Sequence, residues 1–516
     1  MKNTLKSVVG SIVCAATVMS LFSGCQTVKK ESTSSDALTY WRELPAASSA
    51  IVTNLGDTPF AKKLQEETGT KIVYQHPPQG QSEEKFNLLI ASKNLPDIIE
   101  YKWCNYPGGP GKAISDGKII RLNEYIEQYA PELKKYFDEH EEVARLCTTD
   151  DGDIFGFPFV RGTDELCITE GLIVRKDWLE ELNIAEPETI DDWEQMLTAF
   201  KEAKQIDSPL DITVYPFMIG AFSGAYGTPT NYFVEDGKVK YGPYEAAFKD
   251  FLKKMNEWYT KGLITPDIAS IENNVITSDM LSGKTGAVLG ALGGGMGTLL
   301  AGKPDDKFDL VGVKYPVLNK GDLPKFHSHQ LPCPGNFVAI STNCKNPEAA
   351  VKLLAYGYTE EGQMLYNFGI EGESYEIKEG YPTYTDKITK NEDGYNMANM
   401  LGQYCLSFDQ GPFIQHKEYY EQYAGLPQQQ DAWNKYAVGD GINRTVPYIF
   451  YSDEESTKLA KKQTAVDTYV KEQICKYIMG IESIDDFDKF TTELEKNGIK
   501  EILDAKQKAY DKYLSR

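Results

Sequence analysis

Alternating short apolar runs and amphipathic stretches predict that this chain folds from strands and helices in turn. Residues 71–74 and 98–101 are short runs rich in apolar residues, which is typical of buried strands. Between them, residues 83–92 repeat their apolar residues at helical spacing, so that they fall on one face. This order of elements predicts an α/β fold, with a mainly parallel sheet and helices on its faces.

Capping residues indicate where several helices begin and end. Thr58, followed by a proline, predicts the start of a helix that Gly69 ends, because proline suits the first turn and glycine suits the residue after the last. Residues 189–192 form a capping box, and the Asn-Pro pair at 346–347 predicts another helix start. We also expect one long helix over residues 243–262.

The second half of the chain repeats the α/β pattern and then departs from it. Buried strands are predicted at 172–174, 286–291 and 336–340. The Gly-, Tyr- and Asn-rich stretch 369–445 is expected to be irregular. Residues 452–514 are predicted to form three helices separated by glycines, a helical C-terminal tail.

The N-terminus has the layout of a secretory leader. Lys2 and Lys6 precede an apolar run that closes with Leu-Phe-Ser-Gly-Cys at residues 21–25. This ending resembles the bacterial lipobox, in which the thiol of the cysteine takes a diacylglyceryl group before cleavage. We therefore expect residues 1–24 to be a signal peptide and Cys25 to be lipidated. The alternative is an ordinary signal peptide in which Cys25 is incidental.

Composition limits the partners that the mature chain can have. Residues 25–38 are polar and rich in Ser and Thr, as expected of a flexible linker that joins the lipid to the fold. The formal net charge of the full chain, −22, argues against binding to nucleic acid or to an anionic membrane surface. No second apolar run is long enough to span a membrane. We expect contact with the membrane only through the lipid anchor.

The cysteines do not form a recognisable framework. Seven follow Cys25, an odd number without a CxxC pair, which indicates neither a disulfide scaffold nor a zinc site. They are Cys104, Cys147, Cys167, Cys333, Cys344, Cys405 and Cys475. At least one thiol must therefore be free.

No catalytic set is evident. The adjacent acidic pairs fit capping or solvated positions, and His327 and His329 lack the i, i+4 spacing of helical zinc sites. Gly-Lys-Thr at 283–285 lacks the first glycine of a phosphate-binding loop, and the glycines at 293–297 do not match the dinucleotide fingerprint. We expect no enzyme activity, no cofactor and no metal.

Three tryptophans are candidate ligand contacts, because aromatic faces suit the flat C–H faces of sugar rings. Trp41 and Trp103 each follow a predicted strand at its carboxyl end, where open α/β sheets bind ligands. Trp433 lies in a polar stretch and could face a cleft. Packing in the core, or pinning of a segment, is the alternative role for each.

Three further residues complete the candidate ligand set. Arg161 could donate to hydroxyls or to a carboxylate, or could instead pair with a neighbouring acidic residue. Tyr226 and Phe368 are loop aromatics beside glycine, where a ligand has room. Packing roles are equally open for both.

Seven short segments, taken in order, resemble the family 1 extracellular solute-binding proteins. The resemblance extends over about residues 40–514, and the likeness is greatest to the long lipoproteins of Gram-positive carbohydrate importers. The segments are 86–98 (FNLLIASKNLPDI), 153–158 (DIFGFP), 175–179 (RKDWL), 261–267 (KGLITPD), 346–350 (NPEAA), 360–362 (EEG) and 469–472 (YVKE).

The resemblance implies a two-lobed periplasmic-binding-protein-like fold with a ligand cleft at a hinge. Lobe 1 would comprise residues 39–160 and 322–372, so that the unit beginning at 336 returns to it. Lobe 2 would comprise residues 161–321 and 373–516, including the C-terminal helices. The chain would capture a carbohydrate, most simply an oligosaccharide, and deliver it to the permease subunits of an ABC importer as a monomer.

Two departures from the family pattern carry expectations of their own. Some long relatives have an acidic calcium loop where this chain has only residues 205–210, so we expect no calcium there. Residues 293–295 are glycines where maltose-type relatives place a stacking tryptophan.

Two other functions stay open: a surface glycoside hydrolase with two carboxylates across a cleft, and a ligand sensor coupled to a membrane kinase.

Overall fold

The computed structural model describes residues 37–406 and 410–516. The predicted signal peptide, the lipidation site Cys25 and nearly all of the predicted linker lie outside these residues. The fold begins where the pattern places it, with strand β1 at Leu38. Within the described residues, no helix has the length and hydrophobicity needed to cross a membrane.

The first sheet has six strands in the order β14-β4-β11-β3-β1-β2. Strand β1 runs parallel to β2 and β3, and β14 runs parallel to β4, whereas β11 is antiparallel to both β3 and β4. The sheet is therefore mixed. Its strands are β1 (Leu38–Trp41), β2 (Ile72–Gln75), β3 (Ile98–Tyr101), β4 (Phe157–Arg161), β11 (Phe337–Ile340) and β14 (Phe413–Gln415).

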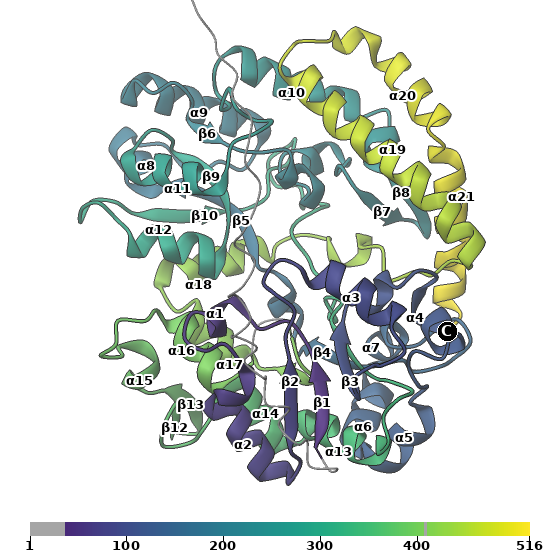
Figure 1. The fold of residues 1–516 in the computed structure, drawn as a ribbon. Coiled ribbons are helices and arrows are strands. Elements are labelled where there is room, and N and C mark those ends of the chain that lie inside the picture. The colour runs from purple at the N-terminus through teal and green to yellow at the C-terminus, as the bar shows by residue number, and fades with distance from the viewer. Residues whose placement is uncertain (1–36, 407–409) are drawn as a thin grey trace, which may run out of the picture. The chain divides into compact units, whose positions relative to one another are not determined.

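Helices cover this sheet and share one hydrophobic core with it, which together we call lobe 1 (lower part of Figure 1). The predicted caps are confirmed, because the Thr58 hydroxyl accepts from the N–H of Ala61 and Gly69 has φ +63°. The helices are α2 (Pro59–Thr68), α3 (Ser82–Ala91), α4 (Gly109–Ser115), α5 (Asn123–Tyr129), α6 (Pro131–Glu139), α7 (Glu141–Leu146), α13 (Pro347–Ala355) and α14 (Glu360–Phe368).

The second sheet has four strands in the order β10-β5-β9-β6, and it organises lobe 2. Strand β5 is antiparallel to β9 and β10, and β6 is parallel to β9. The strands are β5 (Glu170–Arg175), β6 (Leu210–Asp211), β9 (Ala287–Ala291) and β10 (Leu310–Val313), and a separate hairpin is formed by β7 (Tyr232–Glu235) and β8 (Lys238–Tyr241).

Alternation along β5 sends side chains to two different cores. Leu172 and Val174 join one core with several helices, whereas Ile173 joins a core on the opposite face. The first face carries α8 (Lys176–Leu182), α9 (Ile190–Lys204) and α10 (Phe248–Thr260). The opposite face carries α11 (Asn273–Ser282), α12 (Thr298–Ala301) and α18 (Pro427–Tyr436).

The chain crosses between the two sheets more than once. Strand β4 of the first sheet leads into β5 of the second, and β10 of the second sheet leads back into β11 of the first. Strand β14 then pairs with β4, and the chain continues to α18, which packs on β10. Strand β11, in the unit that begins at 336, therefore pairs within the first sheet, and the predicted lobe boundaries stay a prediction. Residues 413–415 fall in the range predicted for lobe 2, but their backbone pairing places them in the first sheet.

Two local predictions are wrong. The helix expected from residue 243 begins at Phe248, because residues 242–244 form a single 3₁₀ turn and Glu245 is extended. The stretch 369–445, predicted to be irregular, is largely made of helices and strands. Each of these elements is too short to show a periodic pattern in the sequence. It contains β12 (Tyr375–Lys378), β13 (Tyr381–Tyr384), α15 (Asp386–Thr389), α16 (Met397–Tyr404), α17 (Lys417–Tyr423) and α18. Helix α16 packs on α1 (Ala46–Ser49).

The tail forms three helices as predicted: α19 (Asp453–Ile478), α20 (Phe487–Lys496) and α21 (Ile499–Leu514). Helix α21 spans both lobes (yellow in Figure 1), because Ile499 and Ile502 belong to the lobe 2 core and Tyr513 to the lobe 1 core. At its end, Arg516 pairs with Asp150 of lobe 1 at 2.6 Å. The tail therefore ties the two lobes together.

Asp211, at the end of β6, gives lobe 2 a measurable pH dependence. Burial, with the negative charge of Asp279, raises the pKa of Asp211 to about 7. An unfolded aspartate titrates near 3.9, so between pH 4 and 7 the folded chain holds a proton that the unfolded chain has lost. Stability from this group is therefore lost as pH rises through that window.

We predict that Asp211→Asn removes this component of the pH dependence. The melting temperature of the variant minus that of the parent should grow as pH rises from 5 to 8, measured by differential scanning calorimetry. Asp207→Asn, at an exposed neighbouring position, is the matched control and should follow the parent. Parallel curves for Asp211→Asn and the parent would contradict the assignment.

Candidate functional site

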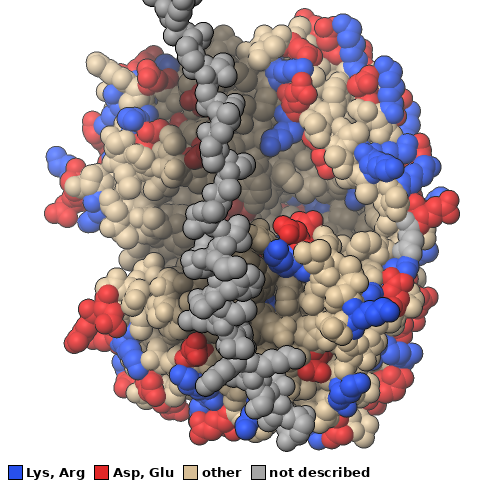
Figure 2. Space-filling model, in the orientation of Figure 1, with Lys and Arg blue, Asp and Glu red and all other residues tan. Residues whose placement is uncertain are grey.

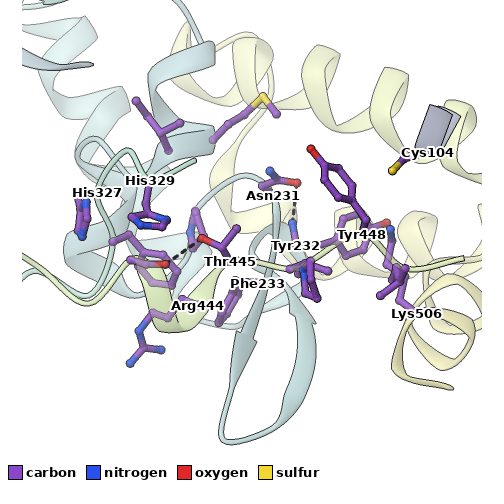
Figure 3. A pocket seen from close by; sticks show the side chains of 18 of the residues that line it. Cys104, Asn231, Tyr232, Phe233, His327, His329, Arg444, Thr445, Tyr448 and Lys506 are labelled. Carbon is purple, nitrogen blue, oxygen red and sulfur yellow. Dashed lines mark hydrogen bonds between the residues drawn. The ribbon is translucent and has the colours of Figure 1, made fainter. Parts of the chain in front are cut away.

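A cavity of about 400 Å³ opens between the two lobes. Cys104 and Asn105 line it from lobe 1, and Met218 and Asn231 line it from lobe 2. The segment 441–451, which leads from α18 to α19, forms much of the remaining wall. Figure 3 shows His327 and His329 on one side of the cavity and Cys104, Tyr448 and Lys506 on the other.

A second cavity, of about 320 Å³, lies at the carboxyl ends of β1 and β3. It is lined by Glu43 just after β1, by Lys102 just after β3, and by Asn336 just before β11. Asn105 lines both cavities, so they adjoin. In Figure 2 the surface is hollowed between the two lobes, with acidic and basic side chains at the edge of the hollow. The second cavity thus lies at the carboxyl ends of strands, where open α/β folds bind ligands.

A buried ion pair shapes this edge of lobe 1. Arg42 Nη1 lies 3.2 Å from Glu100 Oε2, and both side chains are at most 4% exposed. The Tyr40 hydroxyl donates to the same carboxylate at 2.8 Å, and the N–H of Gly411 donates to its other oxygen at 2.9 Å. Arg42 Nη2 also donates to Gln410 Oε1 at 2.5 Å. The pair thus fixes residues 410–411 against the ends of β1 and β3.

Arg161, at the end of β4, joins three segments that connect the lobes. Its Nη2 donates to Gln330 Oε1 at 2.7 Å, on the way from β10 to β11, and its Nη1 donates to Gln415 Oε1 at 3.0 Å, at the end of β14. The backbone N–H of Arg161 donates to the carbonyl of Pro332 at 2.8 Å. The side chain is 5% exposed. The structure thus shows a hinge contact for Arg161, while its predicted role in ligand binding stays a prediction.

Glu170, the first residue of β5, accepts hydrogen bonds from two hydroxyl groups. The Tyr215 hydroxyl donates to its Oε1 at 2.8 Å, and the Ser328 hydroxyl donates to the same atom at 3.4 Å. Burial raises the pKa of Glu170, and the two hydroxyl donors act in the opposite direction. The Glu170 carboxyl group, at the start of β5, therefore helps to position the segment that contains Ser328.

His329 is the most unusual polar side chain of this wall. Both of its ring nitrogens are buried and neither has a hydrogen-bond partner in the structure. Burial lowers the pKa of His329 to about 4, and the nearby His327 adds to that effect. The imidazole is therefore neutral at physiological pH.

The two predicted strand-end tryptophans pack in the lobe 1 core. The Trp41 ring is 6% exposed and lies beside Phe86 and Tyr101. Trp103 is fully buried, and its indole N–H donates to the carbonyl of Ile99 at 3.2 Å. Neither ring lines either cavity in this conformation.

The other aromatic candidates also pack against protein. Trp433 is 4% exposed, and its indole N–H donates to the carbonyl of Glu165 at 2.8 Å. Phe368 is fully buried with Tyr384 against it, and Tyr226 is half-buried against Phe251. The six candidates are thus spread over three cores and the hinge. Their ligand contacts stay predictions.

Sequence reasoning missed several cavity residues, and only some of them have a sequence pattern that could have identified them. Lys102 and Asn105 follow directly after β3, so the strand-end rule that selected Trp103 applied equally to them. Asn231 precedes a hairpin, and His329 lies in a long irregular crossing, where no local pattern marks a binding residue. Their role depends on the arrangement of distant segments.

The described residues contain no group of three or more His, Cys, Asp or Glu side chains able to hold a metal ion. The seven cysteines after Cys25 are all free thiols. The residues at 293–295 lie in the π-helical turn Leu292–Gly297, which follows β9 of the second sheet and lines neither cavity. The expected absence of calcium at residues 205–210 stays a prediction.

Comparison with known proteins gives a consistent picture. Residues 53–364 match the family described as bacterial extracellular solute-binding protein. The chain is 26% identical over 492 residues to the fructooligosaccharide ABC transporter substrate-binding protein FusA of Streptococcus pneumoniae, covering 88% of this chain and 86% of FusA. It is 25% identical over 385 residues to the lipoprotein LipO of Bacillus subtilis, covering 70% and 74% of the two chains.

Solved structures agree on the fold. The alginate-binding protein AlgQ2, in a structure without calcium ion, superposes with a TM-score of 0.72 at 25% identity, over 92% of this chain and 98% of AlgQ2. An "HMO binding ABC-transporter associated Solute Binding Protein" from Bifidobacterium longum infantis superposes with a TM-score of 0.76 at 19% identity, over 92% of this chain and 99% of that protein. The predicted two-lobed α/β fold is confirmed.

We predict that Glu100→Gln destabilises lobe 1 strongly, because it leaves the buried Arg42 guanidinium without its counter-charge. The free energy of unfolding in urea should fall by about 3–5 kcal/mol. Glu67→Gln removes a surface partner of Lys63 and should cost under about 1 kcal/mol. Equal effects from the two substitutions would show that the buried pair does not hold this edge.

Proposed function

Because this chain belongs to the bacterial extracellular solute-binding protein family, we propose that it captures an oligosaccharide between its lobes and delivers it to an ABC importer. The observation that carries the proposal is the cavity lined from both lobes, together with the adjoining cavity at the strand ends of the first sheet. The names of FusA, AlgQ2 and the Bifidobacterium protein support a carbohydrate as the ligand class.

The mechanism we propose is closure about the hinge at Arg161. A ligand that contacts both lobes favours the closed form, because only that form makes both sets of contacts. The permease subunits of the importer then recognise the closed lobes. The receptor acts as a monomer in this scheme.

No covalent chemistry is required by this proposal. Glu43 and Glu83 line the same cavity, which is the feature that a glycosidase of two carboxylates would also need. The family consists of binding proteins, and this supports capture without cleavage. The experiment below separates the two functions.

The receptor test incubates the purified chain with a panel of neutral and acidic trisaccharides to pentasaccharides. We predict that at least one member raises the melting temperature and is recovered intact by mass spectrometry, because binding to the folded form alone stabilises it. Shorter products in the recovered ligand would establish a hydrolase instead. Heat-inactivated protein controls for spontaneous cleavage.

We further propose that Cys25 carries a lipid that keeps the receptor at the outer face of the cell membrane. The similar protein LipO of Bacillus subtilis is named a lipoprotein, which supports this anchor. A tether keeps released ligand near the permease before it diffuses away.

We predict that Cys25→Ala releases the receptor into the medium. Ligand binding by the released protein should be unchanged, whereas cellular uptake of radiolabelled ligand should fall. Cys14→Ala, within the predicted leader, is the matched control and should stay in the membrane fraction. Membrane retention of the Cys25→Ala protein would contradict the lipid anchor.

A further inference from the structure

The orphaned imidazole of His329 requires a partner that the protein does not supply. Buried polar atoms are almost always hydrogen-bonded, because a buried donor or acceptor without a partner costs about 1–3 kcal/mol. Both ring nitrogens of His329 lack one, although the ring lines the cavity between the lobes. Both nitrogens are closed off from solvent in this conformation, so a ligand hydroxyl in that cavity would satisfy them once the ring turns toward it.

The segment that carries His329 is held on both sides. Ser328 donates to Glu170 of the second sheet, and Gln330 accepts from Arg161 of the first sheet. The backbone N–H of Gln330 also donates to the carbonyl of Cys167 at 2.8 Å. His329 is therefore fixed between the lobes before ligand arrives, as a specificity-determining group should be.

A neutral imidazole matches one kind of ligand group better than another. One ring nitrogen donates and the other accepts, so the pair complements hydroxyl groups, which also do both. A carboxylate only accepts, and it would leave the accepting nitrogen unsatisfied. With a pKa near 4, His329 offers no positive charge to an anion at neutral pH.

Other charges around the cavities do not provide a site for a carboxylate either. Arg444 is already paired with Glu235 at 3.0 Å and with Asp440 at 3.2 Å. In the adjoining cavity, Glu43 and Glu83 are negative groups that face any anion bound there. Lys102 lies beside them and offsets part of that charge.

Lys506 is the remaining cation of the lining, and it is directed toward protein groups. Its ammonium lies 4.2 Å from the centre of the Tyr232 ring, a cation–π contact. Burial lowers the pKa of Lys506, and the charge of Asp467 acts in the opposite direction. If the ligand were acidic, its binding would depend on the positive charge of Lys506.

We propose that His329 contacts the ligand directly and that it selects an uncharged oligosaccharide over a uronate. Its two ring nitrogens bind hydroxyl groups of the sugar, one as donor and one as acceptor. This inference rests on the proposed function and adds the ligand class and a residue that determines it.

The test measures affinities by isothermal titration calorimetry for neutral and acidic probes. The neutral probes are 1-kestose, xylotriose, cellotriose, maltotriose and lacto-N-tetraose, and the acidic ones are trigalacturonate and an alginate trisaccharide. We expect a neutral probe to bind at least tenfold more tightly than either acidic one. For that probe, His329→Phe should weaken binding about tenfold or more, which corresponds to about 1.4 kcal/mol.

Matched variants separate a ligand contact from a packing effect. His329→Gln keeps a donor and an acceptor and should recover at least part of the affinity that the Phe variant loses. His140→Phe, at a half-buried position on lobe 1 that lines neither cavity, should bind as the parent does. Lys506→Met should weaken the neutral probe less than threefold.

The contrary outcomes are distinct. Tighter binding of an acidic probe, with loss of that binding in Lys506→Met, would overturn the neutral ligand class and leave the receptor function intact. Parent-like affinity in His329→Phe would overturn the contact. Failure of every carbohydrate to bind would overturn the proposed function and this inference with it.

A second measurement avoids dependence on folding of the Phe variant. The parent chain has five histidines, so ring-¹⁵N labelling gives few signals, and His329→Gln identifies the one from His329. Saturation with the bound neutral probe should shift that signal. An unmoved His329 signal at saturation would overturn the proposal.

Discussion

The guanidinium of Arg161 is the interaction on which the two-lobed arrangement depends most directly. It lies at the end of β4 and donates to Gln330 and Gln415, which belong to two other segments between the sheets. A buried arginine is costly to leave without partners, so its donors hold these segments at fixed separation. The proposed closure of the lobes would take place around this contact.

The same arrangement explains why polar groups gather at the sheet edges. Arg42 and Glu100 pair at the ends of β1 and β3, and Glu170 receives hydroxyl donors at the start of β5. Each group fixes a loop at the cleft and leaves space between the lobes. These contacts hold loops at the cavity walls, where the buried imidazole of His329 has no hydrogen-bond partner in the described structure.

Much of the fold could be predicted from the sequence, because the determining contacts are local. The caps at Thr58 and Thr189 bond to residues three positions away, and their helices form where predicted. The candidate site could not be predicted in this way. Gln330 and Gln415 lie 169 and 254 positions from Arg161, so no spacing in the sequence reveals that the three meet.

The aromatic candidates show the limit of the strand-end rule. Trp103 does follow β3 as expected, but its indole N–H bonds to Ile99 and the ring enters the core, while Asn105 lines the cleft. The rule selects a sheet edge and does not distinguish an inward side chain from an outward one. The rule also does not apply to crossing segments such as 328–330, because their place in the cavity wall depends on contacts with residues far away in the sequence.

The central claim, that ligand closes two lobes about a hinge, is tested most directly by small-angle X-ray scattering. The chain expressed without residues 1–25 is measured alone and with a saturating oligosaccharide that raises its melting temperature. Closure predicts a smaller radius of gyration and a shorter maximum dimension in the bound form. An unchanged scattering profile at saturation would contradict hinge closure.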